Sequence, residues 1–168
     1  AYRVLKDPEY LAVAERNAHF IINKQLREDG GLNHSYKEGR STINGYLEDY
    51  AATIEAFLTL YEVTLNETWL NSARDLANYS FDHFFDEKSK LFYFTSNLDA
   101  SLVSRSVEYR DNVIPASNSI MAKNLFKLSH YFDNKHFAET ARTMLNNVKP
   151  EIIDYGSGFS NWLDLMMN

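Results

Sequence analysis

Two adjacent acids, Glu48 and Asp49, stand in the stretch "NGYLEDYA" (residues 44–51), where a helical pattern begins. Carboxylates are common general acids and bases, and a pair of them flanks the scissile bond in most glycoside hydrolases. Neighbouring helical residues point about 100° apart, so these two acids cannot flank one glycosidic bond from opposite sides. We expect at most one of them to act as the acid, and Asp111 is the candidate for its catalytic partner.

The alternative for Glu48 and Asp49 is that they only start a helix. A carboxylate in the first turn gains about 0.3–1 kcal/mol from the helix dipole and the free N–H groups. The repeat-related stretch "VIPASNS" (113–119) begins another helix without any acid. Helix starting therefore does not require carboxylates in this chain, and both interpretations stay open.

Two long connections, "GGLNHSYKEGRSTING" (30–45) and "SNLDASLVSRSVEYRDNV" (96–113), precede helical patterns. Long loops on a rigid scaffold often carry binding groups. These two supply aromatic rings that can stack on sugar faces, together with guanidinium, imidazole and amide groups that can bond hydroxyls. The candidate ligand-binding residues are Tyr46, His34, Tyr36, Arg40, Arg105, Tyr109, Arg110, Ser117 and Asn118.

Several of these polar residues have a structural alternative. Arg105, Arg110 and Asp111 can form ion pairs that order their loop, and Ser117 and Asn118 are common residue types at helix starts. His34 has no companion His or Cys at metal-ligand spacing, so no metal site is expected. The chain also has no Gly-rich phosphate loop and no nucleophile elbow, and no cofactor is expected.

Hydrophobic spacing predicts the helices that must position these groups. They cover about 8–27, 45–64, 67–84, 115–131 and 134–148, and a further helix begins near residue 159. The segment 86–90 is predicted as a turn and "LFYFT" (91–95) as a short extended piece. The helices at 45–64 and 115–131 are apolar on most sides, which predicts burial, whereas the others are amphipathic.

These helices repeat. A shift of about 68 residues lays "YAATIEAFLTLYEVT" (50–64) on "NSIMAKNLFKLSHYF" (118–132), and a shift of about 59 relates the first amphipathic helix to the one after Asn66. Alternating buried and half-exposed helices at this period predict an all-α fold, a partial α/α toroid of six to seven helices in hairpins. An ordinary bundle or a straight solenoid is the alternative.

The shift also aligns the polar strips of the two buried helices. Glu55 falls on Lys123, Thr59 on Lys127 and Glu62 on His130. Neighbouring inner helices thus offer opposite charges at equivalent heights, and we expect a lining of paired charges around the axis. The alternative is two unrelated solvated strips.

Composition limits the function classes. The 168 residues fit one domain or part of a larger one, and a net charge of −6 without a basic stripe argues against nucleic acid and anionic membranes. No apolar run approaches the roughly 20 residues that cross a bilayer. Zero cysteines exclude disulfides and thiolate chemistry in this segment. We expect a cytoplasmic protein, and interpret the sequons at Asn33, Asn66 and Asn78 as chance.

Three stretches carry a resemblance: "GYLEDYA", "LTLYEVTLNETWLNSARDLA" and "SRSVEYRDNVIPASNSIMAKNLFKLS". They resemble the family of spermatogenesis-associated protein 20 and its bacterial relatives. That resemblance implies an N-terminal thioredoxin-like domain joined to an (α/α)6 toroid, which is similar to the toroids of N-acylglucosamine 2-epimerases and six-hairpin glycosidases. This chain has Ala116-Ser117 where the family usually has Ser-Gly, and Val107 where Lys is more usual.

The resemblance implies that residues 1–168 are a single segment of the toroid domain and a fragment of a longer chain. Its open edges should associate with one another or with the remainder of the parent toroid. The implied function is carbohydrate-related, with a sugar or polyol ligand and an epimerase or hydrolase reaction. The alternative is a non-catalytic module that docks a partner or scaffolds the thioredoxin-like domain. Because the segment lacks Cys-x-x-Cys, any redox chemistry of the parent protein lies outside it.

Overall fold

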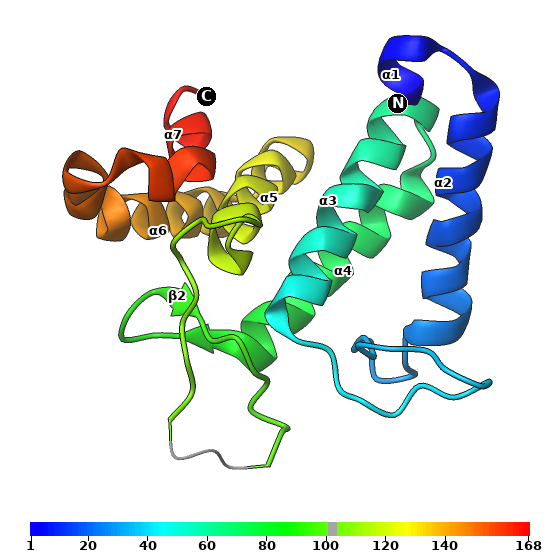
Figure 1. Cartoon of the computed structure of the whole chain (residues 1–168), viewed down its shortest axis with the longest axis horizontal. Helices are drawn as coiled ribbons and strands as arrows, with labels where there is room; N and C mark the ends of the chain where they lie inside the picture. Colours follow the sequence, from blue (N-terminus) through cyan, green and yellow to red (C-terminus); the bar gives the residue numbers. More distant parts are fainter. Residues whose placement is uncertain (101–103) are drawn as a thin grey trace.

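The computed structural model describes residues 1–100 and 104–168, and almost all regular structure in it is helical (Figure 1). The middle of the second long connection, residues 101–103, lies outside the described residues. The helices are α1 (Tyr2–Leu5), α2 (Pro8–Phe20), the π-helix η1 (Ile21–Gln25), α3 (Leu47–Thr64), α4 (Glu67–Phe84), α5 (Ser117–Phe132), α6 (Lys135–Asp154), the 3-10 helix η2 (Gly156–Phe159) and α7 (Ser160–Met166). One short antiparallel pair, β1 (Phe85–Asp86) with β2 (Leu91–Phe92), follows α4.

The chain forms a row of helical hairpins. Helix α3 packs on α4, α5 packs on α6, and the inner helices α3, α5 and α7 contact one another in that order. Tyr50, Ile54 and Leu58 of α3 are fully buried, as are Met121 and Leu125 of α5. The predicted alternation of buried and half-exposed helices is therefore confirmed.

The hairpin turns show the repeat at the level of single residues. Leu65 ends α3 with φ 55° and Asp133 ends α5 with φ 48°, both in the left-handed region. The next residue is Asn in both turns. Asn66 accepts a hydrogen bond from the Thr68 N–H at 3.0 Å, and Asn134 accepts one from the Phe137 N–H at 3.2 Å. A left-handed residue followed by a side-chain cap ends one helix and begins the next within two residues.

Some predicted boundaries were wrong. Helix α2 ends at Phe20 and continues directly into the wider turn of η1, in which the Leu26 N–H bonds the Ile21 carbonyl, five residues back. Helix α6 continues past the predicted end at Val148, with Pro150 inside it. Asp86 lies in β1 rather than in a turn. The short helix α1 had not been predicted.

Charges pair between the inner helices, but not at the predicted positions. Glu62 of α3 forms an ion pair with Lys127 of α5 at 3.0 Å, and a second one with Arg3 at 2.9 Å. Lys123 pairs with Asp164 of α7 at 2.5 Å instead of with Glu55. Long side chains reach along the helix axis, so shift-equivalent residues need not be partners.

Helix α1 lies at one end of the row and helices α6 and α7 lie at the other (Figure 1), and large apolar side chains are exposed at both ends. Val4 and Leu5 of α1 are 82% and 61% exposed at one end. Ile153 of α6 and Met167, after α7, are 85% and 81% exposed at the other. Within the described residues, no helix is both long and apolar enough to span a membrane.

Candidate functional site

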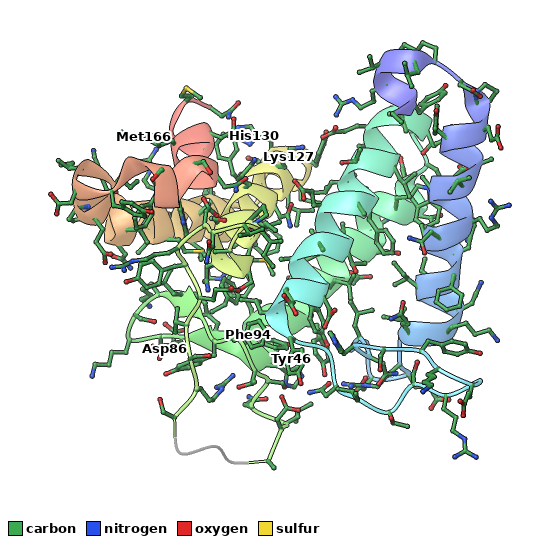
Figure 2. The ribbon with its side chains drawn as sticks, in the orientation of Figure 1. Tyr46, Asp86, Phe94, Lys127, His130 and Met166 are labelled. Atoms are coloured by element: carbon green, nitrogen blue, oxygen red, sulfur yellow. The ribbon has the colours of Figure 1, made fainter. Side chains whose placement is uncertain are left out.

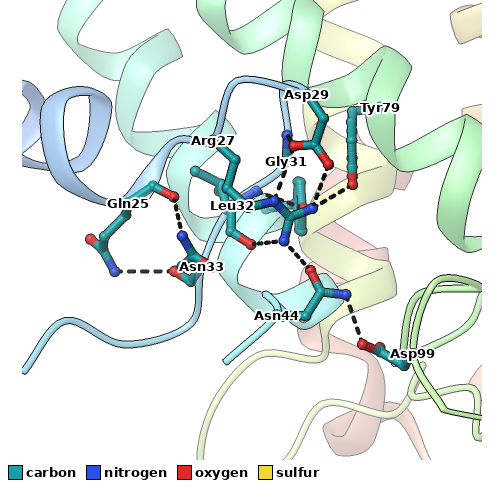
Figure 3. A network of polar contacts seen from close by, with 10 residues as sticks. Gln25, Arg27, Asp29, Gly31, Leu32, Asn33, Asn44, Tyr79 and Asp99 are labelled. Atoms are coloured by element: carbon teal, nitrogen blue, oxygen red, sulfur yellow. Dashed lines mark hydrogen bonds and ion pairs between the residues drawn. The ribbon is translucent and has the colours of Figure 1, made fainter. Parts of the chain in front are cut away.

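The two long connections are tied together by a polar network centred on Arg27 (Figure 3). Its guanidinium donates to Asn44 Oδ1 at 2.5 Å and to the Tyr79 hydroxyl at 2.8 Å, and it pairs with Asp29 at 3.0 Å. The Asn44 amide then donates to Asp99 Oδ1, in the second connection, at 2.8 Å. Hydrogen bonds from Arg27 and the Gly31 N–H lower the pKa of Asp29. The Asp29 carboxylate therefore stays ionised, and paired with Arg27, to a lower pH than an ordinary aspartate.

The start of α3 is held against the first connection by Leu32, Gly45 and Tyr50. The Leu32 N–H donates to the Tyr50 hydroxyl and the Gly45 N–H donates to the Leu32 carbonyl, both at 2.8 Å. A Cβ on Gly45 would lie 2.8 Å from the Leu32 carbonyl oxygen. This close approach explains the glycine in "NGY", and it fixes where the acids that follow are placed.

Asp49 both caps α3 and contacts the first connection. Its carboxylate accepts a hydrogen bond from the Tyr46 N–H at 2.8 Å, which satisfies a free donor at the helix start. The same carboxylate oxygen lies 2.9 Å from His34 Nδ1. Asp49 thus has the capping role that its position predicted, and in addition its carboxylate contacts the His34 ring.

Glu48 lines a pocket of about 380 Å³ between α3, η1 and the start of α5. The pocket is lined by Ile21, Gln25, Leu32, Asn33, Glu48, Asp49, Ala52, Thr53, Ile114, Pro115 and Ile120. Burial raises the pKa of Glu48, and the neighbouring charges of Asp49 and Glu108 raise it further, while His34 opposes them. Glu48 therefore holds its proton to a higher pH than an ordinary glutamate, as a general acid must.

Aromatic rings gather beside these acids. Tyr46 stacks on Phe94 with ring centroids 5.0 Å apart (Figure 2). The His34 ring packs edge-on against Tyr46, with centroids 4.9 Å apart. Tyr36 instead packs on Phe20 at the end of α2. Arg40 lies at the exposed tip of the same connection, where its backbone pairs with Lys37.

Asp111 is buried, and its carboxylate accepts hydrogen bonds from three donors. Oδ1 accepts from the Ala116 N–H at 2.9 Å and the Ser119 hydroxyl at 2.6 Å, and Oδ2 accepts from the Asn161 N–H at 2.8 Å. The structure thus places Asp111 as a cap that joins the start of α5 to the start of α7.

Ser117 and Asn118 are also buried and hydrogen-bonded. Asn118 exchanges hydrogen bonds with the Phe92 backbone, at 2.8 and 2.9 Å, and donates to the Glu108 carbonyl at 2.8 Å. Ser117 donates to the Glu108 carboxylate at 3.0 Å. Sequence reasoning missed Glu108, a further acid near the helix starts. No local signal pointed to it, because irregular chain separates Glu108 from the helix start that it contacts.

The two arginines of the second connection and Tyr109 form hydrogen bonds and an ion pair with other parts of the chain. Arg105 donates to the carbonyls of Thr95 and His83 and lies over the Tyr93 ring at 4.2 Å. Arg110 pairs with Glu151 of α6 at 2.6 Å, and the Tyr109 hydroxyl donates to the same carboxylate at 3.1 Å. The loop-ordering alternative fits these contacts.

The structure therefore brings together four of the predicted residues, His34, Tyr46, Glu48 and Asp49. The other eight lie elsewhere or are engaged in structural bonds: Tyr36, Arg40, Arg105, Tyr109, Arg110, Asp111, Ser117 and Asn118. Across residues 1–100 and 104–168, no three His, Asp or Glu side chains gather closely enough to hold a metal ion.

No family model matches the chain. The chain is 27% identical over 149 residues to uncharacterized protein B0495.5 of Caenorhabditis elegans, a match that covers 84% of this chain and 20% of that protein. It is 29% identical over 102 residues to spermatogenesis-associated protein 20 of Mus musculus and of Homo sapiens, covering 60% of this chain and 13% of each relative. The predicted resemblance is confirmed, and the chain spans a fifth or less of these curated relatives.

Solved structures of similar fold cover nearly the whole chain. A D-mannose isomerase has a TM-score of 0.67 at 17% identity, covering 88% of this chain and 36% of its own. A cellobiose 2-epimerase from Bacillus thermoamylovorans has a TM-score of 0.68 at 18% identity, with 87% and 39% covered. A GH76 α-mannanase from Bacteroides thetaiotaomicron has a TM-score of 0.69 at 15% identity, with 89% and 40% covered. These likenesses confirm the α/α toroid fold.

Proposed function

We propose that this chain contributes a carbohydrate-binding site to a toroid of the sugar-epimerase and glycosidase type, at the end where the inner helices begin. The ligand is a sugar or a similar polyol, and an epimerase or hydrolase reaction would use Glu48 as its acid. Asp111, the earlier candidate for a second acid, has no part in this proposal because its oxygens already hold three donors.

The observation that carries the proposal is the pocket that contains Glu48. It combines a half-buried carboxyl of raised pKa with apolar walls from Ile21, Ile114 and Ile120. Pockets with few, well-placed polar groups and a perturbed pKa are the usual form of small-molecule sites. The isomerase, epimerase and mannanase that share the fold act on sugars by their names, and this supports a sugar as the ligand.

Calorimetric titration of the full-length protein with D-mannose, cellobiose and mannobiose tests the proposal. We expect at least one sugar to bind, and Glu48→Gln to weaken binding about tenfold, because the amide does not reproduce the hydrogen bonds of the carboxyl. Glu139→Gln, on the exposed face of α6, is the matched control and should bind as the wild type does. Absence of binding by all three sugars would refute the proposed function.

The second candidate is a non-catalytic module. It is favoured by the structural use of most polar residues in the second connection and by the apolar side chains at both ends of the row. In that case residues 1–168, as part of a larger ring in a cytoplasmic protein, would dock a partner or support a thioredoxin-like domain. This candidate would be favoured if no sugar binds and if substitutions at the ends of the row, such as Leu5→Glu or Ile153→Glu, abolish binding of a partner protein.

A further inference from the structure

The contact between His34 and Asp49 has a geometry that the sequence did not suggest. His34 Nδ1 lies 2.9 Å from Asp49 Oδ2 and 3.2 Å from Oδ1. A carboxylate only accepts hydrogen bonds, so this contact requires the proton on Nδ1. In the neutral ring, Nε2 then carries the free lone pair, and no described residue forms a hydrogen bond with it.

Both members of the pair are held in place. Asp49 is fixed by the Tyr46 N–H at 2.8 Å, in the first turn of a buried helix. His34 lies in a small antiparallel hairpin, where its N–H donates to the Ile43 carbonyl at 2.8 Å and Asn33 pairs with Asn44. The edge contact with Tyr46 at 4.9 Å restrains the ring. The His34 side chain is still 37% exposed, so a ligand can reach it.

We infer that His34 is the residue that moves a proton at this site, through Nε2, and that Asp49 is its positioning residue. The inference rests on the proposed function, because the sugar site is what supplies the exchanging hydroxyl. In the transfer, the O–H bond of a ligand hydroxyl or a water breaks, its proton bonds to Nε2, and the electron pair stays on the oxygen. The reverse step returns the proton to an oxygen of the product or to water.

The arrangement gives each group a separate task. Asp49 fixes the tautomer and stabilises the imidazolium that forms, the role that a carboxylate plays behind a catalytic histidine. Glu48, which lines the adjoining pocket, is left to meet the ligand as an acid. The earlier difficulty that two neighbouring acids cannot flank one bond disappears, since the second proton-transfer group comes from the connection rather than from the helix.

The test uses the full-length protein with D-mannose, cellobiose and 4-nitrophenyl α-D-mannoside as probes. With a probe that the wild type turns over, His34→Gln should lower kcat about 100-fold or more and change KM little. Asp49→Asn, which keeps an oxygen for the Tyr46 N–H, should lower kcat similarly with a near-normal melting temperature. His136→Gln, an exposed histidine of α6, should leave both constants unchanged.

Nitrogen NMR of the His34 ring gives a readout that needs no substrate. We expect the Nδ1–H tautomer in the wild type and a smaller share of it in Asp49→Asn, where an NH2 group replaces the oxygen that lies 3.2 Å from Nδ1. An Nε2–H tautomer in the wild type, or turnover that survives His34→Gln, would overturn the inference while leaving the proposed function standing. No turnover of any probe and no sugar binding would overturn the proposed function and, with it, the role of His34.

Discussion

At the scale of single residues, Glu48 stands out because its carboxyl lines a pocket and is partly buried. Its folded-state pKa is raised by burial and by the charges of Asp49 and Glu108. A raised carboxyl pKa means that ionisation is less favourable in the folded than in the unfolded chain. The resulting loss of stability is absent below the unfolded pKa and develops as the pH rises through the folded pKa.

Glu48→Gln should therefore stabilise the protein at neutral pH. We expect a rise in melting temperature on the order of 1–3 °C at about pH 7 and no gain near pH 3, measured by calorimetry. Glu55→Gln, at an exposed position of the same helix, is the control and should change little. If Glu48 served mainly to start the helix, its removal would lower the melting temperature at neutral pH.

At the scale of elements, the hairpin turn at Leu65 contains a strained residue. Leu65 has φ 55° and is 75% exposed, and a left-handed conformation costs most residues roughly 1–2 kcal/mol. Leu65→Gly should stabilise the hairpin by about 0.5–1 kcal/mol in urea unfolding, because glycine adopts this conformation freely. The neighbouring Asn66→Ala should instead cost about 1 kcal/mol by removing the cap. Destabilisation by Leu65→Gly would contradict this account of the turn.

Asn118 joins the start of α5 to β2 and to the second connection. It is fully buried, and Asn118→Ala would leave the N–H and the carbonyl of Phe92 without partners, whereas the Glu108 carbonyl would keep the Asn118 backbone N–H at 3.3 Å. We expect a loss of roughly 2–4 kcal/mol in urea unfolding. Asn112→Ala, at an exposed position of the same connection, should stay within about 0.5 kcal/mol of wild type. A small effect of Asn118→Ala would mean that these buried groups find other donors and acceptors.

Helix positions were predictable because the spacing of hydrophobic residues is a local property of the chain. The repeat could also be recognised in the sequence, since equivalent helices of successive hairpins carry apolar residues at equivalent positions. The widened turn at Ile21–Gln25 was not predictable, because the Gln25 carbonyl is satisfied by Asn33 across the loop. The site was only partly predictable for the same reason. The pairing of His34 with Asp49 spans 15 residues of irregular chain, and no local pattern encodes it.

At the scale of the whole molecule, the row of hairpins ends in exposed apolar residues on both sides. Leu5 is 61% exposed at one end and Ile153 is 85% exposed at the other. We expect the isolated 168-residue segment to self-associate, because burial of such surface is favourable. Sedimentation should show association that rises with concentration and is weakened by Leu5→Glu or Ile153→Glu.

Val113→Glu is the matched control, since Val113 is 96% exposed but lies in the long connection rather than at an end of the row. It should leave association unchanged. If the segment stays monomeric at high concentration, the exposed apolar residues at the ends of the row do not drive association, and the expectation is wrong.

The central claim is that a sugar binds where the inner helices begin, against Glu48. Crystals of the full-length protein soaked with D-mannose or cellobiose test it most directly. The account predicts a sugar ring in the pocket between α3 and Pro115, with a hydroxyl within hydrogen-bonding distance of the Glu48 carboxyl and near His34 Nε2. A sugar bound only elsewhere, or an empty pocket at saturating sugar, would contradict it.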